Sequence, residues 1–411
     1  MFMAIFWEWA EFALRWVHVI TAISWIGSSF YFIALDLGLR PSTDRRQGVS
    51  GEEWQVHGGG FYFIQKYMVA PARMPADLIW FKWESYATWL SGVALMFVVY
   101  YLGAELYLVD PNVLDIPLWA GIGLSLASLT IGWIAYDFVC KSKFGDDNTR
   151  LMLFLYVVLV IMAWGYTQVF SGRAAFLHLG AFTATVMTAN VFFIIIPNQK
   201  IVVKDLVEGR TPDPKYGKIA KQRSTHNNYL TLPVLFMMLS NHYPLAFASK
   251  YNWIIAALVF LMGVTIRHFF NTMHKRGGML WWTWGLTAGL FVAIMWLSTA
   301  GIFLQDKEDG DEAAVLGPAA QRFASAEGFE DVHDIVLGNC SMCHAREPAW
   351  QGMASPPKGV RLETSQEIAT MAKEIWLQAG VTHAMPPNNL TYMDDESREM
   401  IRKWYEAGLE G

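Results

Sequence analysis

Charged residues are scarce in this sequence. Asp, Glu, Lys and Arg supply 16% of its 411 residues, whereas an ordinary soluble domain has about 25%. Together with a hydrophobic content of 54%, this shortage excludes a disordered chain and argues against a purely soluble one. The small net charge of -5 argues against nucleic acid as a partner. Only three cysteines are present, too few for a disulfide scaffold, so any cysteine chemistry must lie in their local spacing.

Long apolar runs dominate the first three quarters of the chain. A helix that crosses a bilayer needs roughly 20 mostly apolar residues, and the sequence has eight such runs. They are centred near Ile23, Val93, Ala127, Val158, Thr185, Leu235, Val259 and Val292. The 19 Trp and 26 Phe suit aromatic belts at the two lipid interfaces. We therefore predict an all-α fold in which residues 1–304 form a polytopic bundle of eight transmembrane helices surrounded by membrane lipid.

The charges in the loops predict the orientation of these helices. Lys and Arg collect after the first, third, fifth and seventh runs, as at Arg40, Lys143, Lys204 and Arg276, and cytoplasmic loops carry such an excess. The first run is too long for a signal-peptide core and follows glutamates rather than a positive segment, so we interpret it as a retained helix. Both termini are then expected on the periplasmic side of a bacterial inner membrane.

The end of the chain has the sequence of a small haem protein. After an acidic linker over residues 305–322, residues 323–411 are amphipathic and charged enough to form a separate domain. Cys340, Cys343 and His344 make the pattern C-x-x-C-H, in which two thiols attach haem c covalently and the histidine binds the iron. Met385, next to two prolines, is the expected second iron ligand. With Asp394 expected to cap a last helix, this segment resembles the class I cytochrome c fold.

Three histidines are expected near the periplasmic boundary of the membrane. His18, His178 and His242 lie in three different predicted helices, at about the same depth. Ionisable side chains in a membrane are costly and are functional candidates, so we predict that two of these three bind the iron of a haem b. The competing interpretation is that each ring donates a hydrogen bond to a neighbouring carbonyl.

A second group of polar and aromatic residues is expected near the cytoplasmic boundary. It combines a Gly-rich segment, the start of the sixth run and the end of the seventh, and these donors and rings suit a flat, anionic, hydrogen-bonding molecule. The candidates are His57, Phe61, Gln65, Arg73, His226, Asn227, Arg267 and His268. The alternative for the Gly-rich segment is a simple turn before an interfacial stretch.

The whole layout resembles a known enzyme family. The resemblance rests on Trp25-Ile26-Gly27, the His57–Gly60 segment, the motif from His226 to Pro233, the motif from Ser240 to Pro244, and the C-terminal haem motif. It is similar to the membrane-bound urate oxidases (urate hydroxylases) that carry a C-terminal cytochrome c. The resemblance implies oxidation of urate to 5-hydroxyisourate, with electrons passed to a respiratory-chain acceptor, either a soluble cytochrome c or a terminal oxidase, and not to oxygen as peroxide.

With urate as the substrate, each cytoplasmic candidate can be given a role. Arg73 or Arg267 would form an ion pair with the anion. Gln65 or Asn227 would hydrogen-bond to the groups at its edge, and Phe61 would stack on its ring. The general base would be His57 or His226. Because one haem c takes one electron and urate gives two, a second redox centre is expected, which the predicted haem b would supply.

Two other functions fit the same sequence features. One is a membrane dehydrogenase for another substrate such as a quinol, and the other is a transporter or scaffold with a cytochrome tail. A haem–copper oxidase is disfavoured, because the many helix-borne histidines that its metals need are missing from this sequence.

Overall fold

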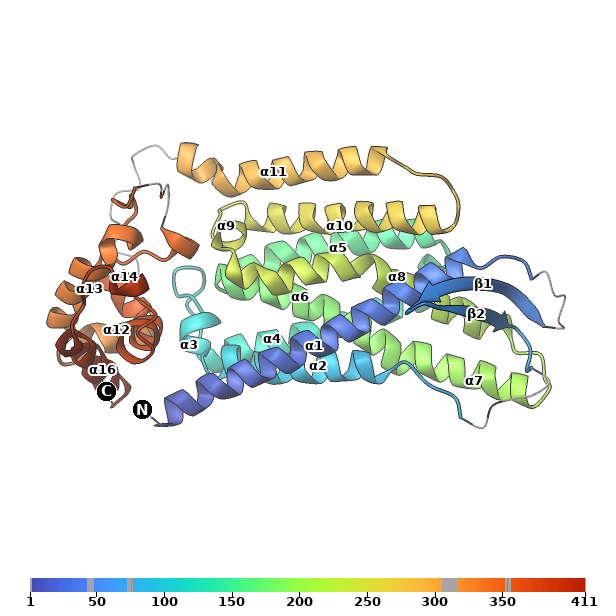
Figure 1. The fold of residues 1–411 in the computed structure, drawn as a ribbon, viewed down its shortest axis with the longest axis horizontal. Helices are drawn as coiled ribbons and strands as arrows, with labels where there is room; N and C mark the ends of the chain where they lie inside the picture. The colour runs from blue at the N-terminus through green and yellow to red at the C-terminus, as the bar shows by residue number, and fades with distance from the viewer. Residues whose placement is uncertain are drawn as a thin grey trace.

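The protein is an elongated helical bundle with a small domain at one end. The computed structural model describes residues 2–42, 48–71, 75, 77–304, 316–351, 353 and 356–410. Figure 1 shows the small domain, here called the tail, at one end of the bundle and a two-stranded hairpin at the other. Both chain termini lie at the tail end, which is the arrangement that an even number of crossings before the tail produces.

The bundle is built from long helices joined by short connections. In chain order they are α1 (Phe2–Gly38), α2 (Trp83–Met96) continued by η1 (Phe97–Tyr101), α3 (Ala104–Tyr107), α4 (Leu118–Lys141), η2 (Lys143–Asp146), α5 (Asn148–Thr167), α6 (Gly172–Ala189) continued by η3 (Asn190–Ile195) and α7 (Ile196–Val207), α8 (Pro214–Leu239), η4 (Ser240–His242), α9 (Pro244–Phe247), α10 (Asn252–His274) and α11 (Trp282–Leu304).

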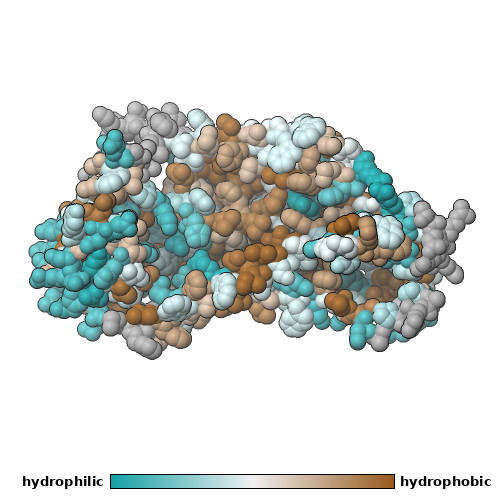
Figure 2. All heavy atoms as spheres, in the orientation of Figure 1, coloured by the Kyte–Doolittle hydropathy of each residue, from teal (hydrophilic) through white to brown (hydrophobic). Residues whose placement is uncertain are grey.

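Six helical stretches in the described part of the chain are long and apolar enough to cross a membrane. They are Ile5–Gly38, Leu118–Lys141, Asn148–Thr167, Gly172–Val207, Asn252–His274 and Trp282–Thr299. The other two predicted spans also form helices, α2 with η1 and α8, but neither is among these six. Helix α8 begins with a strongly polar half, which lowers its hydropathy. Figure 2 shows apolar side chains over the middle of the bundle and hydrophilic ones over the tail, so six spans are supported and eight stay a prediction.

A β-hairpin departs from the predicted all-α fold. Strands β1 (Val49–His57) and β2 (Gly60–Tyr67) pair antiparallel, and the turn between them has Gly58 and Gly59 at positive φ. Glycine adopts this conformation without steric cost, so the glycines expected in a loop instead close a hairpin. The hairpin lies against the end of α1, where the Tyr31 hydroxyl donates to Gln55 (2.8 Å).

A proline explains why one long helix widens in its middle. The helix that runs from Gly172 to Val207 contains the π-helical turn η3, which immediately precedes Pro197 in α7. Proline has no amide hydrogen and its ring clashes with the carbonyl four residues earlier, and a π turn accommodates both effects. Such turns are frequent at functional sites, and η3 begins at the fully buried Asn190.

The tail is a compact set of short helices around its own core. They are α12 (Pro318–Ser325), α13 (Phe329–His344), η5 (Pro357–Gly359), α14 (Ser365–Thr370), α15 (Ala372–Ile375), η6 (Trp376–Val381), η7 (Pro387–Asn389) and α16 (Asp395–Glu410). The predicted cap of the last helix is confirmed, because Asp394 accepts a hydrogen bond from the amide of Ser397 (2.8 Å). Of the predicted apolar stripe on α16, Ile401, Trp404 and Tyr405 are buried, whereas Met400 is largely exposed.

The tail begins earlier than the sequence predicted. Residues 305–315 of the predicted linker lie outside the described residues, but its last part forms α12, with Pro318 in the first helical turn. Ala319 and Ala320 are buried, and Ala320 belongs to the tail's core with Phe323. The boundary at residue 323 therefore cuts a helix that packs inside the domain.

Candidate functional site

A cluster of buried polar side chains surrounds α8 in the half of the bundle nearer the hairpin. We call it the α8 cluster. It takes side chains from α4, η3, α8 and α10, all less than 9% exposed. Its members are Tyr136, Asn190, Arg223, His226, Asn227, Asn228, Arg267 and Asn271.

One side of the α8 cluster is a hydrogen-bonded chain centred on Tyr136. The Tyr136 hydroxyl lies 2.7 Å from Nδ1 of His226 and accepts a hydrogen bond from the Asn190 amide (3.0 Å). That amide also donates to Oδ1 of Asn227 (3.1 Å), whose own amide donates to a backbone carbonyl. This chain fixes the His226 ring, and when its Nδ1 carries the proton, Nε2 has a free lone pair for base chemistry.

A buried ion pair lies beside this chain. Nη2 of Arg223 donates to Asp137 (2.8 Å), and the guanidinium lies over the Tyr136 ring, 4.8 Å from its centre. The other oxygen of Asp137 accepts from Lys141 (2.5 Å), a side chain exposed at the end of α4. Asp137 thus neutralises Arg223 in the bundle and connects it to the surface.

The other side of the α8 cluster carries a cation without an acidic partner. Nη2 of Arg267 donates to Asn271 (3.1 Å), whose amide donates to Asn228 (2.8 Å). The Arg267 guanidinium lies over the ring of Phe30 at 4.0 Å, and no ion pair to it occurs in the described part of the chain. An Arg, two amides and an aromatic face are what a planar anion with several hydrogen-bonding edges requires.

Unmet hydrogen-bonding groups concentrate in this cluster. Among the described residues, nine buried side-chain atoms have no hydrogen-bond partner, and five of them are here. These five are Oδ1 of Asn190, Nε and Nη1 of Arg223, Nδ2 of Asn228 and Nε of Arg267. Burying such groups unpaired costs about 1–3 kcal/mol each. A concentration of four unmet donors and one acceptor therefore points to a bound polar molecule, with water as the simplest alternative.

The structure brings together part of the predicted substrate site. His226, Asn227 and Arg267 belong to the α8 cluster, and His268 follows on α10 with its Nδ1 3.2 Å from the Tyr229 hydroxyl. The hairpin residues do not join them. His57 is exposed beside the hairpin turn, Phe61 is 79% exposed, and Gln65 contacts Glu52 and Tyr67 within the hairpin. Arg73 lies outside the described residues.

The sequence reasoning missed the partners from α4, η3 and α10. Asn190 is a single polar residue in an apolar stretch, and Tyr136 and Asn271 belong to no motif that the sequence analysis used. They could have been selected because burying an amide or hydroxyl in a membrane helix costs free energy unless the group has a hydrogen-bond partner. The proline after Asn190 was a second signal for an irregular turn there.

The three histidines predicted to hold haem b have different surroundings. His178 is fully buried, with Nδ1 2.7 Å from the Ala174 carbonyl and Nε2 2.8 Å from the Ser125 hydroxyl, so both nitrogens are occupied and its ring does not fit an iron ligand. Nδ1 of His18 lies 3.0 Å from the Thr88 carbonyl. This contact orients the ring and leaves Nε2 available as a metal ligand. His242 is exposed at the tail end.

The tail places the C-x-x-C-H residues on the last turn of α13. Cys340 and Cys343 are free thiols, and burial raises the pKa of the Cys340 thiol to about 11. Nδ1 of His344 lies 2.8 Å from the Val360 carbonyl, and donation to this carbonyl leaves Nε2 facing away as a metal ligand. The indole nitrogen of Trp376 is buried without a partner. Two free thiols, an oriented imidazole and an unmet donor fit a covalently attached haem.

The segment that carries Met385 is held by a buried arginine. Arg398 is 3% exposed and donates to the carbonyls of Met385 (3.0 Å) and Ala379 (2.6 Å) and to the side chain of Asn389 (3.1 Å). The amide of Met385 donates to the Gln378 carbonyl (3.0 Å). Arg398 is therefore a positioning residue for this loop, which the sequence analysis did not identify.

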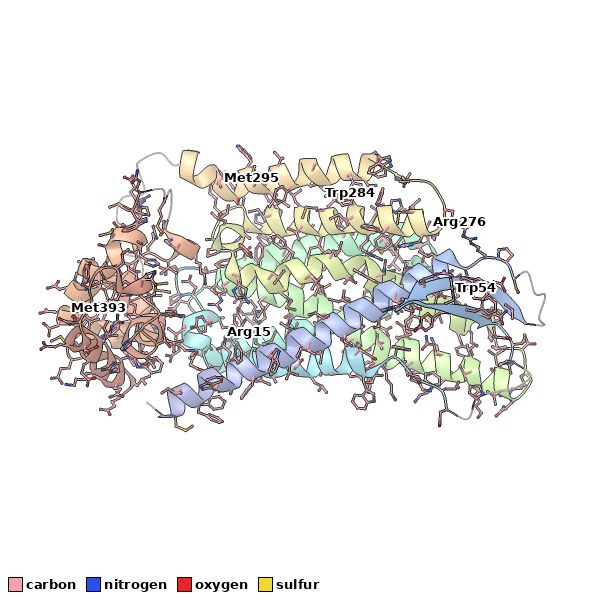
Figure 3. The ribbon with its side chains drawn as sticks, in the orientation of Figure 1. Arg15, Trp54, Arg276, Trp284, Met295 and Met393 are labelled. Atoms are coloured by element: carbon pink, nitrogen blue, oxygen red, sulfur yellow. The ribbon has the colours of Figure 1, made fainter. Side chains whose placement is uncertain are left out.

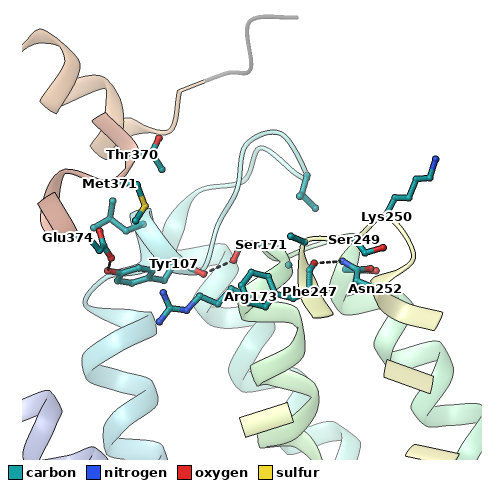
Figure 4. A pocket seen from close by; sticks show the side chains of 15 residues that line it. Tyr107, Ser171, Arg173, Phe247, Ser249, Lys250, Asn252, Thr370, Met371 and Glu374 are labelled. Atoms are coloured by element: carbon teal, nitrogen blue, oxygen red, sulfur yellow. Dashed lines mark hydrogen bonds between the residues drawn. The ribbon is translucent and has the colours of Figure 1, made fainter. Parts of the chain in front are cut away.

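A pocket of about 580 Å³ lies where the tail meets the bundle (Figure 4). The bundle contributes Tyr107 and Arg173 to its wall, and the tail contributes Met371 and Glu374. The Arg173 guanidinium lies over the Tyr107 ring at 4.8 Å, and the Tyr107 hydroxyl donates to Glu374 (2.7 Å). Arg173 and Glu374 thus both contact Tyr107, Nε of Arg173 has no hydrogen-bond partner in the described part of the chain, and the pocket lies at the contact between the two parts.

Comparison with known proteins assigns most of the bundle to a family. Residues 4–298 match the family model described as urate oxidase N-terminal, a match that covers the helical bundle and ends before the tail. No curated protein and no solved structure matches the chain. No group of three or more His, Cys, Asp or Glu residues suited to a metal ion occurs within the described ranges.

Proposed function

The chain belongs to the urate oxidase N-terminal family, and on that premise we propose that it oxidises urate to 5-hydroxyisourate in the α8 cluster. Urate and one water give 5-hydroxyisourate, two protons and two electrons. The electrons leave through the tail to a respiratory-chain acceptor, a soluble cytochrome c or a terminal oxidase, and no peroxide is formed. The protein lies in a bacterial inner membrane, spans it eight times, and has both termini and the tail in the periplasm.

The observation that carries this proposal is the concentration of unmet donors in the α8 cluster, one of them on Arg267, which has no acidic partner among the described residues. Urate is a planar monoanion near neutral pH, with carbonyl and nitrogen acceptors around its edge. Arg267 neutralises its charge, Asn228 supplies an unmet amide donor, and Phe30 offers a ring beside the guanidinium. Charge-assisted hydrogen bonds of this kind are worth about 1.5–3 kcal/mol each, enough to hold a small anion in place.

His226 is the proposed general base. Its Nδ1 lies 2.7 Å from the Tyr136 hydroxyl and the residue is 2% exposed, so Nε2 is the atom that we propose takes a proton from urate or from the attacking water. The ion pair of Asp137 with Arg223 and Lys141 connects this region to the surface. Protons released by the reaction are expected to leave toward that end of the bundle.

The tail is proposed to hold haem c, attached to Cys340 and Cys343, with His344 and Met385 as the iron ligands. Bound there, the haem would accept one electron at a time, and His/Met ligation would raise its reduction potential. Val360 orients His344, and Arg398 holds the Met385 loop.

Anaerobic addition of urate to the purified protein tests the proposal. We expect the tail haem to become reduced, as seen in its absorption spectrum, with two electrons delivered per urate. A quinol that reduces the haem when urate does not would instead show a dehydrogenase for another substrate. Haem that neither compound reduces would favour a transporter or scaffold.

Replacing Met385 with Ala should lower the haem potential without releasing the haem. The thioether is proposed as an iron ligand and not as the attachment point, so haem staining of a denaturing gel should be unchanged. Potentiometric titration measures the expected fall. An unchanged potential would remove Met385 as a ligand.

A membrane haem b is proposed to be held by two of His18, His178 and His242. His178 uses both ring nitrogens in hydrogen bonds, so we expect His18 and His242 to be the pair. Replacing each with Ala should remove the haem that acid acetone extracts, whereas His178→Ala should retain it. Retention in all three variants would refute this site.

A further inference from the structure

The tail contacts the bundle along a line of charged and aromatic residues. Lys373 pairs with Glu8 of α1 (2.6 Å) and Arg322 pairs with Glu105 of α3 (2.9 Å). Ile5, at the start of α1, packs against the core of the tail. We call the two ion pairs and the bond between Tyr107 and Glu374 the seam.

In both ion pairs of the seam, the tail supplies the cation and the bundle supplies the glutamate. Over residues 316–411 the tail has eight Lys and Arg against fourteen Asp and Glu, so it is acidic as a whole. Yet two of its few cations, Arg322 and Lys373, face glutamates of the bundle. Two cations of an acidic domain that pair with two glutamates of the bundle, together with the bond from Tyr107 to Glu374, favour docking in one orientation.

This orientation places the His344 side of the tail against the bundle. The η5 turn touches α9, because a Cβ on Gly359 would lie 3.1 Å from Cβ of Pro244. Val360, the next residue, accepts the hydrogen bond from Nδ1 of His344, and the amide of Leu362 donates to the His344 carbonyl (2.8 Å). A short run of bonded and touching groups therefore connects His344 to the bundle.

On the bundle side, this contact is next to the proposed haem b ligand His242. His242 is two residues before Pro244, the residue that the η5 turn touches. Arg15, three residues before the other proposed ligand His18 on α1, lies in the part of the bundle near the tail, far from Trp54 of the hairpin (Figure 3).

We infer that the seam is the electron entrance of the tail: it holds the η5 turn on Pro244, and electrons from urate cross there to the His344 side. This inference rests on the proposed function. Each urate oxidised releases two electrons, which cross the seam one at a time and reduce the ferric tail haem to ferrous. The respiratory-chain acceptor reoxidises it between crossings. Electron transfer occurs while the tail is docked on the bundle, so the tail need not leave the bundle to be reduced.

Reversing the charges of the seam tests this inference. In Arg322→Glu/Lys373→Glu, both cations become acids that face Glu105 and Glu8. Because like charges repel across an interface and disfavour the docked arrangement, the anaerobic rate of tail-haem reduction by urate should fall about tenfold or more. Reduction by ascorbate, which reaches the tail directly, and the haem potential should not change.

Two further proteins control for damage to the fold. Adding Glu8→Lys and Glu105→Lys to the reversed protein restores opposite charges and should restore the rate with urate. Asp36→Asn/Asp205→Asn removes two paired acids of the bundle away from the seam and should leave the rate unchanged.

The outcomes separate this inference from the proposed function. An unchanged urate rate in the reversed protein, or a slow rate that the charge swap does not restore, overturns the seam as the entrance. If urate fails to reduce even the unaltered protein while ascorbate succeeds, the urate reaction itself is refuted, and with it this route for its electrons.

Discussion

Replacing Cys340 and Cys343 together with Ala is expected to remove all of the covalently bound haem that we propose for the tail. The two thiols are free and lie on one turn of α13, and thioether bonds from this pattern are the proposed covalent attachment. Haem staining of a denaturing gel measures the loss, which should be complete. The same variant should no longer show reduction of a tail haem when urate is added.

The third cysteine provides the control for this double variant. Cys140 is buried near the end of α4 and has no role in haem attachment, so Cys140→Ala should keep full staining. If staining survived in Cys340→Ala/Cys343→Ala, the tail would not be a c-type cytochrome.

The features of the tail that were predictable are local in sequence. The C-x-x-C-H pattern needs only the spacing of one helical turn, and the cap by Asp394 is a bond to a residue three positions on. The start of the domain was misplaced because its first helix follows an acidic stretch. The burial of Ala319, Ala320 and Phe323 in the structure shows that α12 belongs to the core.

The hairpin shows why a strand pattern was overlooked in a helical chain. Trp54 and Phe63 stack across the strands at 4.6 Å, and the alternation around them is visible in the sequence. The sequence analysis interpreted it as a loop of the substrate site, with a turn before an interfacial stretch as the alternative. A two-stranded ribbon is marginal alone, and nothing in the local sequence shows what it packs against. Its support comes from α1, through Tyr31 and the ion pair of Asp36 with Lys66.

The substrate cluster was predictable only along α8. The motif from Arg223 to Asn228 places several polar residues on one helix, and the sequence analysis took His226 and Asn227 from it. The packing of distant segments decides which helices face His226 and Asn227. The hydrogen bond between Tyr136 and His226, for example, joins residues 90 positions apart. For the same reason, His57 seemed close to His226 in membrane depth, yet it lies on an exposed hairpin.

Substitutions in the α8 cluster should impair urate oxidation strongly and leave the haem of the tail intact. His226→Gln removes the proposed base, and losing a general base typically costs about 10²–10⁴ in rate. Arg267→Gln removes the cation, and a lost charge-assisted bond of about 1.5–3 kcal/mol should raise KM for urate roughly ten- to hundredfold. Anaerobic stopped-flow measurement of haem reduction at several urate concentrations separates the two effects.

Matched residues at and just after the end of the helix that carries Arg267 distinguish these effects from a general loss of stability. His274 ends α10 and Arg276 follows it, and neither belongs to the α8 cluster; Figure 3 shows Arg276 at the end of the bundle. His274→Gln and Arg276→Gln should therefore keep the rate and KM of the unaltered protein. Ascorbate should reduce the tail haem normally in all four variants, because the change lies upstream of the tail. Full urate turnover in both His226→Gln and Arg267→Gln would place the substrate elsewhere, and the pocket beside Arg173 would then be the site to test.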